Sequence, residues 1–274
     1  MLTDEQKKLL TKAFADKVRD ELTVELTESL ASKAGICKRF VEIFAIEKGI
    51  IPLRYARNVG SIGLDGQKRL LESSCLVIGL GGLGGFLCEA LARAGVGRIF
   101  AVDKDAFDQT NLNRQLFCTE NNLGEQKAKE AEKRTKQVNN SIEFTAFATP
   151  FSEVPQNIWN DVRLVFDCLD NIKDRLILAQ KCSQSNVPLV HGAIAGWCGE
   201  IATIWPASRM LEKIYKTDTK GIEQNLGTPV FTAATAASIM ASVGIKILTE
   251  KTQKKDNRIL YFDLMENIWQ TVNL

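Results

Sequence analysis

The chain has 274 residues, of which 45% are hydrophobic and 25% are charged, and its formal net charge is +2. This is the composition of an ordinary globular protein, long enough for one large domain with an appendage, and the near-neutral charge gives no support for nucleic-acid binding. The first residues lack a signal-peptide core, and no apolar run approaches the ~20 residues of a membrane-spanning helix. We therefore expect a cytoplasmic protein without a membrane partner.

Residues 1–50 are expected to form an N-terminal helical extension. Thr3 and Gln6 match a capping box at a helix start, and Gly35 matches a helix stop. Apolar side chains recur at helical spacing at Leu10, Phe14, Val18 and Leu22. We expect a helical hairpin that packs on the main domain or on a neighbouring subunit, and a dedicated partner-binding arm is the alternative.

Residues 51–274 are expected to form a single α/β domain. Short apolar runs predict strands at 76–79, 98–103, 142–148, 164–169 and 188–194. Helical patterns lie between them near 85–94, 124–138 and 171–185. Strands that alternate with helices form a parallel sheet covered on both faces, so we expect a doubly wound, Rossmann-like and mostly parallel sheet.

The alternation ends after Ala195. Residues 200–205 predict a strand, and 206–229 form a polar, irregular connection. Residues 231–248 predict a long helix that is apolar nearly all round and therefore buried. Two final strands, at 258–263 and 268–272, are expected to extend the sheet in antiparallel fashion.

A glycine-rich turn follows the first strand of this domain and opens a helix. Its members are Gly79, Gly81, Gly82 and Gly84. Glycines allow the backbone to approach phosphate closely, and the helix N-terminus supplies N–H donors. Asp103 ends the next strand, 19 residues after Gly84, where a carboxylate can accept hydrogen bonds from ribose. Dehydrogenases, methyltransferases and adenylating enzymes share this arrangement, so the turn predicts a nucleotide and leaves its chemistry open.

Three residues further along favour a triphosphate. Arg114 offers a planar fork of donors for phosphate oxygens, and Lys127, near a helix start, adds a point charge. Asp170 ends the fourth strand at the carboxyl edge of the sheet, where a carboxylate near a polyphosphate is expected to hold magnesium. Asn171 is expected to cap the next helix. The later lysines of the Lys127 helix are expected on a solvated face: Lys129, Lys133 and Lys136.

These motifs resemble the ubiquitin-activating superfamily, in particular its bacterial branch of sulfur-carrier adenylyltransferases (the ThiF, MoeB and HesA group). The resemblance covers roughly residues 54–263 and is strongest to the ThiF type, without its zinc cysteines. The matching residues are Arg54-Tyr55-Ala56-Arg57-Asn58, Gly79 to Gly84, Asp103 with Asp105, Asn111-Leu112-Asn113-Arg114-Gln115, Gly124 with Lys127, and Asp170-Asn171.

The resemblance implies ATP-dependent adenylation of a small β-grasp sulfur carrier that ends in Gly-Gly, as in thiamine or molybdopterin sulfur transfer. The terminal carboxylate of the carrier attacks the α-phosphate and releases pyrophosphate. A terminal carboxyl has a pKa of about 3.3–3.7, so it is ionised at neutral pH and needs no general base. Positioning and charge neutralisation then fall to Arg114, Lys127, Asn111 and a magnesium on Asp170. The nucleotide contacts implied are Gly79, Gly81, Gly82, Gly84, Asp103, Asp105, Asn111, Gln115 and Asn171.

Arg57 resembles an arginine that, in this family, reaches into the partner subunit's nucleotide site. This implies a homodimer with composite active sites and a catalytic role for Arg57 in trans. A surface ion pair is the alternative. Asn58 stands where the family often has glutamine.

The cysteines depart from the family pattern. None of the seven lies in a Cys-x-x-Cys pair, so we expect no structural zinc. Residues 206–229, where relatives often carry a reactive cysteine, contain none. Cys198 is the best remaining thiol, although a buried small side chain explains it better; Cys168 is expected in a core strand and Cys118 after the arginine loop. Adenylation without a later thioester or persulfide step is therefore favoured.

Other functions remain open at this point. ATP could activate a peptide C-terminus or a modified tRNA base instead of a carrier. An NAD-dependent oxidoreductase would use the glycine turn but leave Arg114, Lys127 and Asp170 without a joint purpose. A non-catalytic scaffold would bind a carrier without turnover. His191, the only histidine, is expected to pack in the core with one hydrogen bond.

Overall fold

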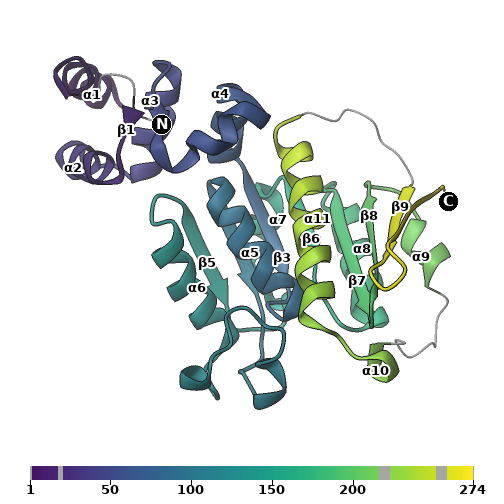
Figure 1. The fold of residues 1–274 in the computed structure, drawn as a ribbon. Coiled ribbons are helices and arrows are strands. Elements are labelled where there is room, and N and C mark those ends of the chain that lie inside the picture. The colour runs from purple at the N-terminus through teal and green to yellow at the C-terminus, as the bar shows by residue number, and fades with distance from the viewer. Residues whose placement is uncertain (1, 18–20, 216–222, 251–257, 274) are drawn as a thin grey trace.

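The computed structural model describes residues 2–17, 21–215, 223–250 and 258–273 (Figure 1). The helices are α1 (Asp4–Lys17), α2 (Val24–Ala34), α3 (Lys38–Glu47), α4 (Ala56–Glu72), α5 (Gly82–Ala94), α6 (Lys127–Val138), α7 (Gln156–Asp161), α8 (Ile172–Gln184), α9 (Met210–Ile214), α10 (Glu223–Leu226) and α11 (Val230–Leu248). The strands are β1 (Glu21–Leu22), β2 (Ile51–Pro52), β3 (Ser74–Ile78), β4 (Arg98–Val102), β5 (Glu143–Phe147), β6 (Leu164–Asp167), β7 (Leu189–Ala195), β8 (Cys198–Ile204), β9 (Arg258–Asp263) and β10 (Ile268–Asn273).

The centre of the molecule is an eight-stranded sheet in the order β10-β9-β8-β7-β6-β3-β4-β5. Strands β7, β6, β3, β4 and β5 run parallel, and β8, β9 and β10 continue the sheet in antiparallel fashion. The predicted doubly wound α/β fold with antiparallel C-terminal strands is therefore confirmed. The carboxyl ends of β3, β4 and β6 meet at one edge, which we call the carboxyl edge.

Both faces of the sheet are covered because the side chains of each strand alternate between them. On β3, Cys75 and Val77 pack with α5, α6 and α11, whereas Leu76 and Ile78 pack with α7, α8 and α9. Figure 1 shows α5 and α11 side by side over the sheet. Residues buried on both faces explain why the central strands read as continuous apolar runs.

The N-terminal helices α1, α2 and α3 form a small unit with its own apolar core, which includes Leu10 and Phe14 (Figure 1, purple). Thr3 and Gln6 form the predicted reciprocal cap, and Gly35 ends α2 in the left-handed conformation. The spacing predicted Leu22 on the first helix, but Leu22 is buried in β1. Val18 lies outside the described residues.

This unit is held to the main domain by a buried polar network. Glu42 on α3 accepts from Ser141 at 2.8 Å and from Tyr55 at 3.3 Å, and it pairs with Arg54 at 3.3 Å. Burial raises the pKa of Glu42, although the Arg54 charge opposes the shift. The Arg54-Tyr55 part of the family motif therefore serves to dock the extension.

The helices differ from the sequence prediction in three places, one of which is α7, where no helix was predicted. The pattern gave no helix at α4, because Gly60, Gly63 and Gly66 interrupt it; Gly63 has a positive φ of 76° and marks a kink. The 206–229 connection, expected to be irregular, contains the short helices α9 and α10.

Helix α11 corrects the expectation that no segment reaches membrane-spanning length. Its 19 residues are long and apolar enough to cross a membrane by length and composition. In the structure α11 packs against α5 and β7, and its Ala236, Ala237 and Ala241 line the core. The core helix of a soluble protein meets the same test.

Candidate functional site

The glycine turn is shaped by contacts that leave no room for a side chain. Gly79 has a φ of +96°, and a Cβ there would lie 2.6 Å from the carbonyl oxygen of Cys168. A Cβ on Gly84 would lie 1.9 Å from the carbonyl oxygen of Gly79. The turn is therefore packed against the backbone that follows β6, and α5 begins directly behind it.

Asp103 supports this turn from the end of β4. Its carboxylate accepts from the backbone N–H of Leu80 at 2.7 Å and of Asp105 at 2.9 Å. Burial raises the pKa of Asp103, and the two backbone donors and the nearby Lys127 charge oppose the shift. Each carboxylate oxygen retains acceptor capacity, which suits a ribose hydroxyl.

Arg114 and Gln115 lie over the turn from the other side. A Cβ on Gly82 would lie 3.5 Å from the aliphatic stem of Arg114. A Cβ on Gly81 would lie 3.7 Å from Gln115 Nε2. Arg114 Nη1 donates to the Thr110 carbonyl at 2.8 Å. Gln115 Oε1 is buried and has no hydrogen-bond partner within the described part of the chain. A buried acceptor beside a bare glycine backbone fits a site that a ligand completes.

Lys127 lies at the first turn of α6, close to the same loop. It is buried, and its Nζ lies 3.8 Å from Asp105 Oδ2. Asn111, also buried, forms a capping box with Asp108: its Oδ1 accepts from the Asp108 N–H at 3.3 Å and its Nδ2 donates to the carboxylate at 3.1 Å. In this structure Asn111 shapes the arginine loop; its contact with a nucleotide stays a prediction.

Asp170 stands exposed at the carboxyl edge, three residues beyond the end of β6. Asn171 caps α8 as predicted, since its Oδ1 accepts from the Asp174 N–H at 2.9 Å, and its Nδ2 lies 3.4 Å from Asp170 Oδ1. Cys168 contacts Gly79, so the segment that carries Asp170 is the one that packs against the glycine turn. An exposed carboxylate beside a phosphate-type turn has the oxygen donors that magnesium prefers.

Arg57 is the one predicted catalytic residue that the fold does not bring to this site. It is exposed on α4 and makes no ion pair or hydrogen bond with the residues that the structure describes. Its neighbour Asn58 donates to the Ala94 carbonyl, at the far end of α5. Helix α5 has 13 residues and therefore spans about 20 Å, which separates Arg57 from the glycine turn of its own chain.

A buried polar cluster was missed by the sequence analysis. His191 lies 2.7 Å from Asp167 and 3.0 Å from the hydroxyl of Tyr215, so the single hydrogen bond expected for it is wrong. Arg175 and Glu200 complete the cluster. A lone histidine and an aspartate in a core strand were the only signals in the sequence.

Packing holds three cysteines in place: Cys118, Cys168 and Cys198. Burial raises the pKa of Cys168 and of Cys118, and Cys168 follows β6 instead of lying within it. Cys198 is half-buried, and its Sγ lies 3.1 Å from the Tyr261 hydroxyl. Of these three cysteines, Cys168 lies against the glycine turn, where its carbonyl and its Cβ face Gly79.

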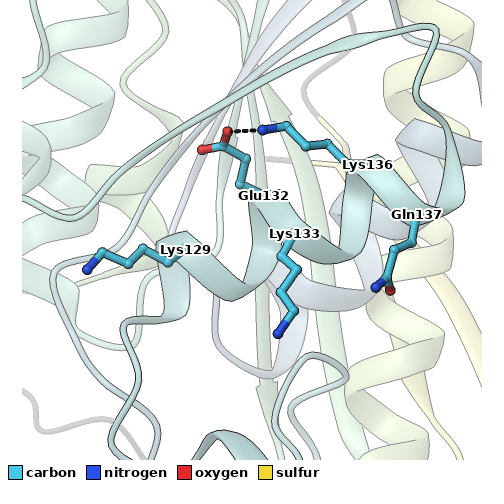
Figure 2. Close-up of a pocket in the computed structure, with 5 residues that line it drawn as sticks. All are labelled: Lys129, Glu132, Lys133, Lys136 and Gln137. Atoms are coloured by element: carbon cyan, nitrogen blue, oxygen red, sulfur yellow. Dashed lines mark hydrogen bonds and ion pairs between the residues drawn. The ribbon is translucent and has the colours of Figure 1, made fainter.

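A surface hollow on the outer side of α6 is separate from this site. It is lined by Lys129, Glu132, Lys133, Lys136 and Gln137, and Figure 2 shows these side chains pointing away from the helix. Lys136 pairs with Glu132 at 2.7 Å. The hollow is a solvated helix face, as predicted for these lysines.

The comparisons with known proteins agree on one family. The model of the ThiF family matches residues 55–274. The SAMP-activating enzyme E1 of Haloferax volcanii is 31% identical over 228 residues, which are 80% of this chain and 84% of that protein. The sulfur carrier protein ThiS adenylyltransferase of Escherichia coli is 34% identical over 157 residues, 56% of this chain and 62% of that protein.

Two further similarities concern the acceptor and the fold. The tRNA threonylcarbamoyladenosine dehydratase of Bacillus subtilis is 37% identical over 139 residues, 50% of this chain and 55% of that protein. A crystal structure of E. coli MccB with ATP matches with a TM-score of 0.66 and 19% identity, over 90% of this chain and 82% of that one. At this identity the structural likeness shows the fold.

Proposed function

The chain belongs to the ThiF family of E1-like adenylyltransferases. We propose that it adenylates the C-terminal glycine of a ubiquitin-like sulfur carrier in the cytoplasm. Two of the similar proteins, the SAMP-activating enzyme and the ThiS adenylyltransferase, are named for acceptors of this kind. ATP is the activating substrate in this proposal, and the carrier ends in Gly-Gly.

The observation that carries the proposal is the convergence of the charged residues on the glycine turn. Arg114 passes over Gly82, Cys168 contacts Gly79, and Asp170 is two residues beyond Cys168. An NAD-dependent oxidoreductase needs the turn and Asp103 but has no use for this set. Cleavage of a triphosphate with release of pyrophosphate uses the turn, Asp103 and the charged residues together, because negative charge moves onto the leaving phosphates.

The residues divide the work of the adenylation step. Asp103 orients the ribose, and the backbone at Gly81 and Gly82 receives the phosphates. Arg114 and Lys127 neutralise charge as the carrier carboxylate attacks the α-phosphate and the bond to pyrophosphate breaks. Magnesium, when held by Asp170, supplies further positive charge to the phosphates. The carboxylate is already ionised, so no side chain has to remove a proton.

We further propose that two copies of the chain form the working unit. Arg57 lies about one helix length from its own glycine turn and is unpaired among the described residues, which suits an arginine that serves the partner's phosphates. No structural zinc is part of the proposal.

Pyrophosphate exchange into ATP tests this function. We expect exchange that depends on a carrier ending in Gly-Gly and is absent with a carrier that lacks those two glycines. Arg114→Ala and Asp170→Asn should abolish exchange, whereas Lys133→Ala, on the solvated face of α6, should retain it. Exchange stimulated by a free peptide or by tRNA instead of the carrier would transfer the proposal to that acceptor. Tight NADH binding without exchange would refute adenylation.

A further inference from the structure

A buried polar cluster lies directly beneath the carboxyl edge. It joins Asp167 at the end of β6, His191 on β7, Glu200 on β8, Arg175 on α8 and Tyr215 after α9. His191 Nδ1 lies 2.7 Å from Asp167 Oδ2, and His191 Nε2 lies 3.0 Å from the Tyr215 hydroxyl, which donates to Glu200 at 2.7 Å. The side chains of Asp167 and His191 are fully buried.

The charges in this cluster satisfy one another. Burial alone would raise the pKa of Asp167, but Arg175 and the hydrogen bond from His191 outweigh it and hold that pKa below its usual value. Arg175 lies 3.2 Å from Asp167 and donates to the Gly192 carbonyl at 2.8 Å. Buried ion pairs contribute little net stability compared with apolar packing, so stability alone gives no reason for the cluster.

One end of the cluster fixes the backbone that carries Asp170. The Leu169 N–H donates to Asp167 at 3.0 Å, and the Leu169 carbonyl accepts from Arg175 Nη2. The Cys168 N–H donates to Ile78 at 2.9 Å, next to the glycine turn. The peptide units on either side of Leu169 are thus held by charged groups, one residue before Asp170.

The other end of the cluster reaches α9. Tyr215 directly follows this helix, its N–H donates to Leu211 at 2.9 Å, and its ring stands edge-on to His191 with centroids 5.6 Å apart. Met210 and Leu211 are buried against the sheet face that also holds Val165. The position of α9 and the orientation of the Asp170 backbone are therefore joined by a continuous set of hydrogen bonds.

We propose that Arg175, with Asp167, His191 and Tyr215, forms a positioning relay that orients Asp170 for magnesium and couples that orientation to α9. This inference rests on the proposed role of Asp170. Arg175 fits it because its planar fork reaches Leu169, Asp167 and Gly192 at once, whereas a lysine has one compact head group. Partners behind a metal ligand commonly change metal affinity by about 10–100-fold.

The first test measures magnesium-dependent binding of a non-cleavable ATP analogue by calorimetry. Arg175→Lys should raise the magnesium concentration for half-maximal binding about tenfold or more, and leave binding without magnesium at the wild-type level. Arg209→Lys is the matched control, because Arg209 is exposed and pairs with Glu212 at the start of α9. An unchanged magnesium requirement in a folded Arg175→Lys protein overturns the relay, and so does equal loss of both kinds of binding.

The second test keeps the wild-type chain and uses its only histidine. A protein labelled with ¹⁵N at histidine gives the ring signals of His191 alone. We expect these signals to shift when magnesium is added to the nucleotide-bound protein. We also expect magnesium to slow backbone hydrogen exchange in α9. Tyr215→Phe should abolish this slowing, whereas Tyr261→Phe should preserve it.

The outcomes separate this inference from the proposed function. If calorimetry detects magnesium-dependent binding while the His191 signals stay fixed, the relay is refuted and adenylation stands. If exchange in α9 does not respond to magnesium in the wild type, the link to α9 is refuted. If the wild-type chain binds no nucleotide, the proposed function fails, and the relay fails with it.

Discussion

At the glycine turn, the sequence is constrained by distances between single atoms. The carbonyl of Gly79 occupies the space in which a Gly84 side chain would stand, at 1.9 Å from its Cβ. The next residue, Gly85, has 3.6 Å to its nearest neighbour, Leu116, and no such restriction. Of these two adjacent glycines on α5, only Gly84 is required by the space around it.

Gly84→Ala should distort the turn, lower the free energy of unfolding by about 1–3 kcal/mol and abolish nucleotide binding, because the backbone at Gly79 must move. Gly85→Ala should raise the free energy of unfolding by about 0.5–1 kcal/mol, as alanine favours a helix, and should leave binding intact. Urea denaturation and calorimetry measure both effects. Normal nucleotide binding by a folded Gly84→Ala protein would show that the turn does not receive the phosphates.

Residues in local motifs were predictable from the sequence, and residues brought together by the sheet were not. Gly79, Asp103 and Asn171 follow from the order strand, turn, helix, which the local pattern encodes. Asp167 and His191 meet only because β6 and β7 are neighbours in the sheet, and the sequence does not give the strand order. The roles assigned to Arg114, Lys127 and Asp170 stay predictions that the geometry accommodates.

Among the helices, α5 and α6 are joined by one carboxylate that two arginines share. Glu89 on α5 accepts a two-point contact from Arg134 on α6, with both distances 2.9 Å. Arg93 adds a contact at 2.7 Å from within α5. The Arg134 hydrogen bond, followed by the Arg93 contacts, outweighs desolvation and lowers the pKa of Glu89. The helix that carries Lys127 is thereby tied to the helix that opens at the glycine turn.

Glu89→Gln should lower the free energy of unfolding by up to about 1 kcal/mol at pH 7, since partial exposure screens the pair. Because the pKa of Glu89 is lowered by folding, its ion pairs contribute their full stabilisation above the pKa of glutamate in the unfolded chain, about 4.3. This stabilisation disappears as the pH falls through the lower pKa of folded Glu89, so the two stability curves should converge in acid. Denaturation from pH 7 to pH 3 measures this. Glu132→Gln, which breaks a single exposed pair, should show a smaller difference.

Long, strongly patterned elements were predicted with small errors at their ends, whereas the helices α4, α7, α9 and α10 were missed. Three glycines hide α4, which is held by the packing of Leu70 and Leu71 against the domain. Helix α9 has only 5 residues, too few for a periodic signal, and it exists because Met210 and Leu211 are buried. Such short or glycine-rich helices form because of tertiary packing, and the local sequence pattern carries no information about that packing.

For the whole molecule, the proposed composite site requires two chains. Arg57 and Lys127 belong to opposite ends of one chain's sheet, since Arg57 is on α4 beside the far end of α5. In a symmetric dimer each active site then takes Lys127 from one chain and Arg57 from the other. Each residue can be removed on a separate chain, which makes the arrangement testable by mixing.

Arg57→Ala and Lys127→Ala chains should each be inactive alone. After subunit exchange, about half of the dimers are mixed, and each mixed dimer contains one intact site and one site that lacks both groups. Pyrophosphate exchange should therefore recover to about a quarter of the wild-type rate. No recovery, with mixed dimers demonstrated by mass spectrometry, would place Arg57 in its own chain's site.

The most direct measurement is a crystal structure of the protein with magnesium and a non-cleavable ATP analogue. We expect the phosphates to lie against the backbone of Gly81 and Gly82, with Arg114 and Lys127 within hydrogen-bond reach of them and the metal on Asp170. A nucleotide bound elsewhere, for example over the lysines of α6, or phosphates that Arg114 and Asp170 both face away from, would contradict this expectation.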